Sequence, residues 1–347
     1  MTRSRPGALA VILVLVTTAC GTGDAGIELV DPTPTLFAEA EPTPETPSST
    51  EAALPEATEV EVPLRDLLPS ARVAGLGIIE VAGIAVPVTA ATGTGWEVVT
   101  PCGFTAELTD RAPRTGVLVV LDPGHGGEDD GAVAADSMIR EDELNLAVAV
   151  ATAELLEGRG VATLVTRHAD TQLPASARAA VVEPSGALVF ISIHHRDDDG
   201  PTAVRPGTEV FHQVDSVQGR RLAGVIHEEL TAALTVAGVD WAAPEEPGVK
   251  YLLNQRGSDF FTVLRDTPAA ASVLVEVASL ATESGATYLA TVDAQQGEAA
   301  ALSEAVIRFL VTSDAGSGYV EPVERVREAP SGGDTRECVD PLVSSSG

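Results

Sequence analysis

The sequence is poor in basic residues, in aromatic residues and in cysteine. Only 21 of its 347 residues are Lys or Arg, against 51 Asp or Glu, which gives a formal charge of -30. This balance argues against nucleic-acid binding, because the affinity for phosphates comes from basic side chains. It also argues against purely electrostatic attachment to anionic lipid. Aromatic residues are 3% and apolar residues 44% of the chain, so we expect a globular core made mostly of Ala, Val and Leu.

The N-terminus lacks an apolar run long enough to cross a membrane. The segment 8–16 is far shorter than the roughly 20 residues that a spanning helix needs. It follows Arg3 and Arg5 and precedes small residues and Cys20, a pattern that resembles a bacterial lipoprotein signal. We therefore expect an exported protein, anchored by a lipid on Cys20 to the outer side of the membrane and facing the cell wall. Ordinary cleavage near Ala19 is the alternative.

Cysteine is scarce, with three residues in the chain. If Cys20 carries a lipid, Cys102 and Cys338 remain as an even pair outside the cytoplasm, which favours one disulfide. Two free thiols are the alternative.

Composition divides the chain into five segments. We expect a signal peptide over 1–20, a disordered Pro/Thr/Glu-rich tether over 21–62, a small β-rich segment over 63–113, a main domain over 114–313 and an irregular tail over 314–347. The tether contains ten acidic residues and no Lys or Arg, so it has too little apolar surface to fold. The β-rich segment carries no recognisable chemistry; structural packing and cell-wall binding are its two possible roles.

Apolar runs and helical periodicities alternate after residue 114, which indicates an α/β domain. The predicted strands are 117–122, 161–166, 188–193, 208–212, 261–264 and 272–277. The predicted helices are 143–157, 175–182, 216–236 and 294–311.

Two histidines follow predicted strands directly. His125 comes after the run 117–122, and His194 after the run 188–193. Ligands of open α/β sheets gather at the carboxyl ends of the strands, so the two imidazoles can share one metal ion. A catalytic zinc commonly has three protein ligands, and Glu141, just before a predicted helix, is our choice for the third. Asp142 and Glu143 are the alternative ligands. Their other possible role is to stabilise the first turn of that helix with their charges.

Glu276 stands alone in the apolar strand 272–277. A buried carboxylate is costly unless it is paired or used in chemistry. Glu276 is therefore a candidate general base toward a metal-activated water, and afterwards a general acid toward a leaving amine.

These residues occur in motifs that resemble the zinc-dependent N-acetylmuramoyl-L-alanine amidases, which cut bacterial peptidoglycan. The resemblance covers about 115–312 and rests on an ordered set of short motifs: Asp122-Pro123-Gly124-His125-Gly126-Gly127, Glu141 with Leu144-Asn145-Leu146, Thr166-Arg167, Ser192-Ile193-His194 and Val273-Leu274-Val275-Glu276. It implies one Zn²⁺ held by His125, Glu141 and His194, with Glu276 as the catalytic carboxylate. It also implies a mixed, mostly parallel sheet of about six strands with helices on both faces.

Two of the chain's departures from the family pattern directly follow predicted site residues. The family often has Ala-Asn or His-Asn after the second histidine ligand, where this chain has His195-Arg196. We expect His195 to line the cleft and Arg196 to contact an anionic part of the substrate. After the catalytic glutamate the family usually has Gly-Phe and then a Ser-Asn pair, where this chain has the segment 277–283.

The resemblance implies hydrolysis of the amide between N-acetylmuramic acid and L-alanine in peptidoglycan by a monomer. Two alternatives remain. The first is an inactive or weakly active amidase-like lipoprotein that binds peptidoglycan, and the second is a zinc peptidase acting on the stem peptide.

Overall fold

The computed structural model describes residues 63–72, 75–134, 139–196, 207–236, 248–316, 324–326 and 338–341. The predicted signal peptide, the tether and Cys20 lie outside these residues. Among the described residues, no helix combines the length and the apolar character that a membrane span requires.

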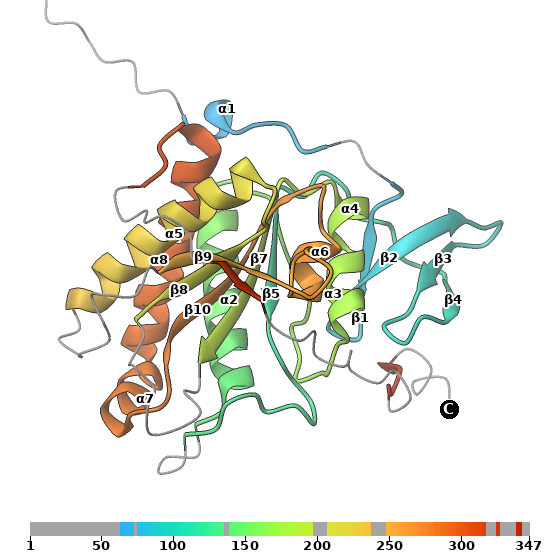
Figure 1. Cartoon of the computed structure of the whole chain (residues 1–347). Coiled ribbons are helices and arrows are strands. Elements are labelled where there is room, and N and C mark those ends of the chain that lie inside the picture. The colour runs from blue at the N-terminus through green and yellow to red at the C-terminus, as the bar shows by residue number, and fades with distance from the viewer. Residues whose placement is uncertain are drawn as a thin grey trace, which may run out of the picture. The chain divides into compact units, whose positions relative to one another are not determined.

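A mixed sheet forms the centre of the main domain (Figure 1). Its strand order is β11-β9-β8-β10-β7-β5-β6. All neighbouring strands run parallel except β8 and β10, which pair antiparallel. The mostly parallel sheet predicted from sequence is therefore confirmed. The strands are β5 (Val119–Pro123), β6 (Thr163–Val165), β7 (Val189–Arg196), β8 (Glu209–His212), β9 (Val249–Leu253), β10 (Ala271–Ser279) and β11 (Glu324–Val326).

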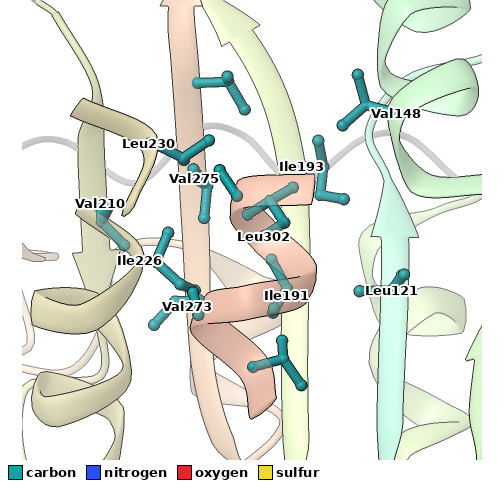
Figure 2. Close-up of a cluster of buried hydrophobic side chains, with 14 of the residues drawn as sticks. Leu121, Val148, Ile191, Ile193, Val210, Ile226, Leu230, Val273, Val275 and Leu302 are labelled. Atoms are coloured by element: carbon teal, nitrogen blue, oxygen red, sulfur yellow. The ribbon is translucent and has the colours of Figure 1, made fainter. Parts of the chain in front are cut away.

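Three long helices cover one face of this sheet. They are α2 (Glu141–Gly158), α5 (Val217–Val236) and α8 (Val292–Val311). Because side chains alternate along a strand, every second residue of β5, β7 and β10 faces these helices. Figure 2 shows the resulting core, in which strand residues such as Ile191, Ile193 and Val275 meet Val148 of α2 and Leu302 of α8.

Short helices cover the other face. They are α3 (Ala175–Ala180), α4 (Val182–Ser185) and α6 (Thr262–Arg265). The intervening strand residues, among them Val120, Phe190 and Leu274, pack here against Val182 and Leu264. His194 and Glu276, described below, alternate onto this same face, beyond the apolar residues near the carboxyl ends of β7 and β10.

The segment before the domain is β-rich, as predicted. After the single turn α1 (Leu64–Leu67), it forms an antiparallel sheet of β1 (Ile78–Val81), β2 (Ile84–Ala91), β3 (Trp96–Val99) and β4 (Thr105–Leu108). Main-chain hydrogen bonds fix it to the domain, for example from Ala85 N to Thr166 O at 3.0 Å. A disulfide joins Cys102 of this segment to Cys338 of the tail, as expected.

Several elements differ from the sequence prediction. The predicted strand 261–264 is the helical turn α6, and β9 and α7 (Glu283–Leu289) were not predicted. β11 lies within the tail that was expected to be irregular. Two differences bear on the site: β7 continues to Arg196 rather than ending at Ile193, and α2 begins at Glu141 rather than at Glu143.

Candidate active site

Three of the predicted ligands meet at the carboxyl edge of the sheet. Single ligand atoms of His125, Glu141 and His194 all lie within 4.8 Å of one another. Glu141 Oε1 is 3.2 Å from His125 Nε2 and 3.0 Å from His194 Nδ1. The two imidazole rings are edge to face, with centroids 4.9 Å apart.

The backbone conformation of the loop after β5 brings the His125 side chain to this cluster. His125 has φ +59°, a left-handed conformation that costs energy for a residue with a side chain. Buried arginines hold the loop in place: Arg178 Nη2 donates to His125 O at 2.7 Å, and Arg167 Nη2 donates to Gly124 O at 2.8 Å. On the next strand the ring of His194 lies against Gly124, where an added Cβ would be 2.2 Å from its Cε1.

Glu141 is anchored through both carboxylate oxygens. Its Oε2 accepts from Ala132 N at 2.8 Å, and its Oε1 accepts from His195 N at 3.1 Å and from Asn145 Nδ2 at 3.3 Å. The residue is the first of α2 rather than preceding the helix.

The two alternatives for the third ligand have other surroundings. The carboxylate of Asp142 is bound by Arg140 at 3.0 Å through both Nε and Nη2. Glu143 has a side chain that is 66% exposed and also pairs with Arg140. The geometry therefore favours Glu141.

The charges of the cluster are strongly coupled. Burial lowers the pKa of His125, but the hydrogen bonds and charges of Asp129 and Glu141 outweigh it and raise the pKa to about 10. Burial raises the pKa of Glu141, but the two histidines outweigh it and hold that pKa far below its ordinary value. A carboxylate between two imidazoles, reached by solvent on the histidine side, is a cation-binding arrangement.

The donor set fits zinc. Three ligands about 2.1 Å from a tetrahedral ion would lie about 3.4 Å from one another, close to the 3.0 and 3.2 Å seen around Glu141 Oε1. Asp129 Oδ2 is 2.9 Å from His125 Nδ1, so a carboxylate orients the ring and leaves Nε2 free for a metal.

Glu276 lies beside this cluster. On β10 it is the register partner of His194 on β7 and of Glu209 on β8, and paired residues of neighbouring strands face the same side of a sheet. Burial raises its pKa above the ordinary value, although the charge of His194 opposes this. Among the described residues, no hydrogen bond to its carboxylate is found.

A buried charged group flanks Glu276. Arg196 and Lys250, the only lysine in the sequence, both form ion pairs with Glu209. Lys250 also lies 5.6 Å above the ring of Phe211. The side chain of Arg196 is 32% exposed and stands two residues beyond His194, on the same face of β7.

The prediction that His195 lines the cleft is wrong. His195 lies within β7, so it points to the opposite face from His194, and it is fully buried. Its ring contacts Asn145 of α2 and Glu298 of α8. Burial lowers the pKa of His195, but the Glu298 carboxylate outweighs this and raises it.

Three other arginines have structural contacts. Arg178 binds the fully buried Asp122, and Arg167 donates only to main-chain carbonyls among the described residues. Arg265 donates to the carbonyls of Asp259 and Phe260.

Sequence reasoning missed two supporting residues, Asp129 and Asn145. Both stand four residues after a ligand. For Asn145 this is a usable signal, because positions i and i+4 share one face of a helix, but only if the helix is taken to begin at Glu141.

The sequence is similar to a known protein family. The family model described as N-acetylmuramoyl-L-alanine amidase (Amidase_3) matches residues 119–308. The uncharacterized protein YqiI of Bacillus subtilis is 30% identical over 213 residues, which are 60% of this chain and 93% of YqiI. The amidase AmiA of Escherichia coli K12 is 34% identical over 121 residues, 35% of this chain but only 41% of AmiA.

Among solved structures, the N-acetylmuramoyl-L-alanine amidase of Clostridium difficile 630 aligns with a TM-score of 0.49 and 26% identity. The alignment covers 57% of this chain and 98% of that one.

The family match includes every residue of the cluster, from His125 through Glu276, and extends over more than half of the chain. The chain belongs to the N-acetylmuramoyl-L-alanine amidase family.

Proposed function

We propose that the protein hydrolyses the amide between the lactyl group of N-acetylmuramic acid and the L-alanine of the stem peptide in peptidoglycan, using one zinc ion. The observation that carries this proposal is the cluster of His125, Glu141 and His194, with Glu276 as the cross-strand neighbour of His194. The names of the relatives support the substrate class.

Zinc would be held by His125 Nε2, Glu141 Oε1 and His194 Nδ1. When bound, it supplies a Lewis acid that polarises the substrate carbonyl and makes water more acidic. Asp129 keeps the His125 ring oriented, and Ala132 N keeps the Glu141 carboxylate in place.

Glu276 is the proposed general base and acid. It takes a proton from the attacking water and returns one to the departing amine of L-alanine. Its raised pKa, caused mainly by burial, suits a carboxyl group that must alternate between charged and neutral forms.

Arg196 is the proposed contact for an anionic part of the substrate, because its side chain is partly exposed on the same face as His194. We further propose that the enzyme is an exported monomer, anchored through Cys20 and held away from the membrane by the tether.

The test is digestion of purified peptidoglycan by the full chain, with products identified by mass spectrometry. We expect free stem peptides that begin with L-alanine, no release with a chelator, and recovery when zinc is added back. Cuts inside the stem peptide would indicate a peptidase, and binding of zinc and peptidoglycan without any product would indicate a binding protein.

Glu276→Gln isolates the proton-transfer role. It should bind zinc normally and lose about 10²- to 10⁴-fold in rate. The matched control is Glu304→Gln, because Glu304 is an exposed carboxylate of α8 that pairs with Arg159. Wild-type turnover by Glu276→Gln would remove Glu276 from the mechanism.

A further inference from the structure

A buried chain of polar side chains connects α8 to the metal cluster from behind the sheet. Glu298 Oε2 is 3.2 Å from His195 Nε2, and His195 Nδ1 is 2.8 Å from Asn145 Oδ1. Asn145 Nδ2 then donates to Glu141 Oε1 at 3.3 Å. None of the four side chains is more than 7% exposed.

The hydrogen-bond donors and acceptors determine which atoms carry protons in this series of side chains. Asn145 faces two groups that only accept, the Glu141 carboxylate and the carbonyl of Gly124, also at 3.3 Å. Its amide nitrogen must therefore point to them, and its oxygen must point to His195. It follows that His195 Nδ1 carries a proton.

Glu298 selects this state of His195. One proton lies between Glu298 Oε2 and His195 Nε2, whichever atom holds it, and both arrangements leave Nδ1 protonated. Without a partner at Nε2, a neutral imidazole could move its proton to that nitrogen. Asn145 would then have to turn its amide, which would bring its oxygen against the Glu141 carboxylate.

We propose that Glu298 is a positioning residue for the metal site, acting through His195 and Asn145 on the orientation of Glu141. The inference rests on the proposed zinc site. Glu141 Oε1 also accepts from the main chain of His195, so the position of His195 affects the ligand by two routes. Loss of such a supporting partner commonly weakens metal binding about 10- to 100-fold.

The experiment measures the zinc dissociation constant of the full chain by competition with a fluorescent chelator. Glu298→Leu keeps the volume but cannot bind the ring, and we expect affinity to fall about tenfold or more. Glu298→Gln can donate to His195 Nε2 and should restore most of that affinity. Glu304→Leu, on the exposed side of the same helix, should bind as the wild type does.

A double-mutant cycle tests the route. If Glu298 acts in part through Asn145, then Glu298→Leu should weaken zinc binding by a smaller factor in an Asn145→Ala background than in the wild type. Fully additive losses, or an unchanged affinity in Glu298→Leu, would overturn the proposal. Failure of the wild type to bind zinc would instead overturn the proposed function.

A second measurement does not depend on the folding of a variant. Nitrogen-15 NMR of the His195 ring in the wild-type protein should show a proton on Nδ1. An unprotonated Nδ1 would contradict the donor order given above.

Discussion

Replacing Arg178 with methionine should lower the free energy of unfolding by about 3–5 kcal/mol at neutral pH. Arg178 is 6% exposed, and its partner Asp122 is fully buried at the end of β5. The substitution would leave a carboxylate in the core without its cation.

The contacts of Arg178 account for this magnitude. Its guanidinium donates to Asp122 at 2.9 Å and to the carbonyls of Leu173, Pro123 and His125 at 2.9, 2.6 and 2.7 Å. Hydrogen bonds to charged groups contribute about 1.5–3 kcal/mol each. These contributions are not fully additive, because the structure around the substitution can relax. The expected loss therefore stays at about 3–5 kcal/mol, which is typical of breaking a buried ion pair.

The loss should depend on pH. Burial raises the pKa of Asp122, but Arg178 and the hydroxyls of Thr166 and Ser192 outweigh it and hold the pKa below its ordinary value. In the wild type the carboxylate therefore stabilises the fold above its unfolded pKa of about 3.9, and this stability is lost as the pH falls through the folded pKa. In the variant, burial without Arg178 should raise the pKa of Asp122, so its carboxylate becomes protonated as the pH falls. The difference in the free energy of unfolding between variant and wild type should therefore shrink toward pH 4.

Urea unfolding of the chelator-treated protein, followed by circular dichroism at pH 7 and near pH 4, measures both effects. Chelation removes metal binding as a second source of pH dependence. Arg159→Met is the matched control, because Arg159 pairs with Glu304 at the surface, and it should cost less than about 1 kcal/mol. Equal losses in the two variants, or a loss for Arg178→Met that does not change with pH, would refute the reasoning.

Three further outcomes are expected. Replacing Cys102 and Cys338 together by serine should lower the free energy of unfolding by about 2–4 kcal/mol, because the disulfide closes a long loop in the unfolded chain; an unchanged urea midpoint would count against this. Gly124→Ala should weaken zinc binding more than about tenfold in a folded protein, because the added Cβ would collide with the His194 ring; normal zinc affinity would contradict the geometry. Arg196→Gln should raise KM for peptidoglycan fragments with little change in kcat, and the reverse pattern would exclude a role in substrate binding.

Much of the fold could be predicted because its signals are local. The apolar runs that became β5, β7 and β10 are bounded by polar or turn residues, and they place His125, His194 and Glu276 at one edge. The secondary-structure prediction failed where a charged residue or neighbouring aromatic residues altered the hydrophobic pattern. Lys250 interrupts the apolar pattern of β9, and in the structure its charge is paired with Glu209. The β-like run at 261–264 forms the helical turn α6, whose Val263 and Leu264 are buried against the sheet.

The site could be predicted less completely, because its supporting contacts depend on where elements end. Ending the strand at Ile193 left the direction of His195 undefined. Extending β7 by two residues, as observed, places His195 on the opposite face by simple alternation. Glu298 could not have been assigned from sequence, because it is 103 positions away from His195, and only the packing of α8 on the sheet brings the two together.

The Cys102–Cys338 bond encloses the whole of the predicted domain 114–313 in a covalent ring. One proteolytic nick anywhere between these cysteines would open that ring without releasing either fragment. The two pieces would separate on a denaturing gel only after reduction. After such a cut, the segments that carry Glu141 and Glu276 would still be joined through the disulfide.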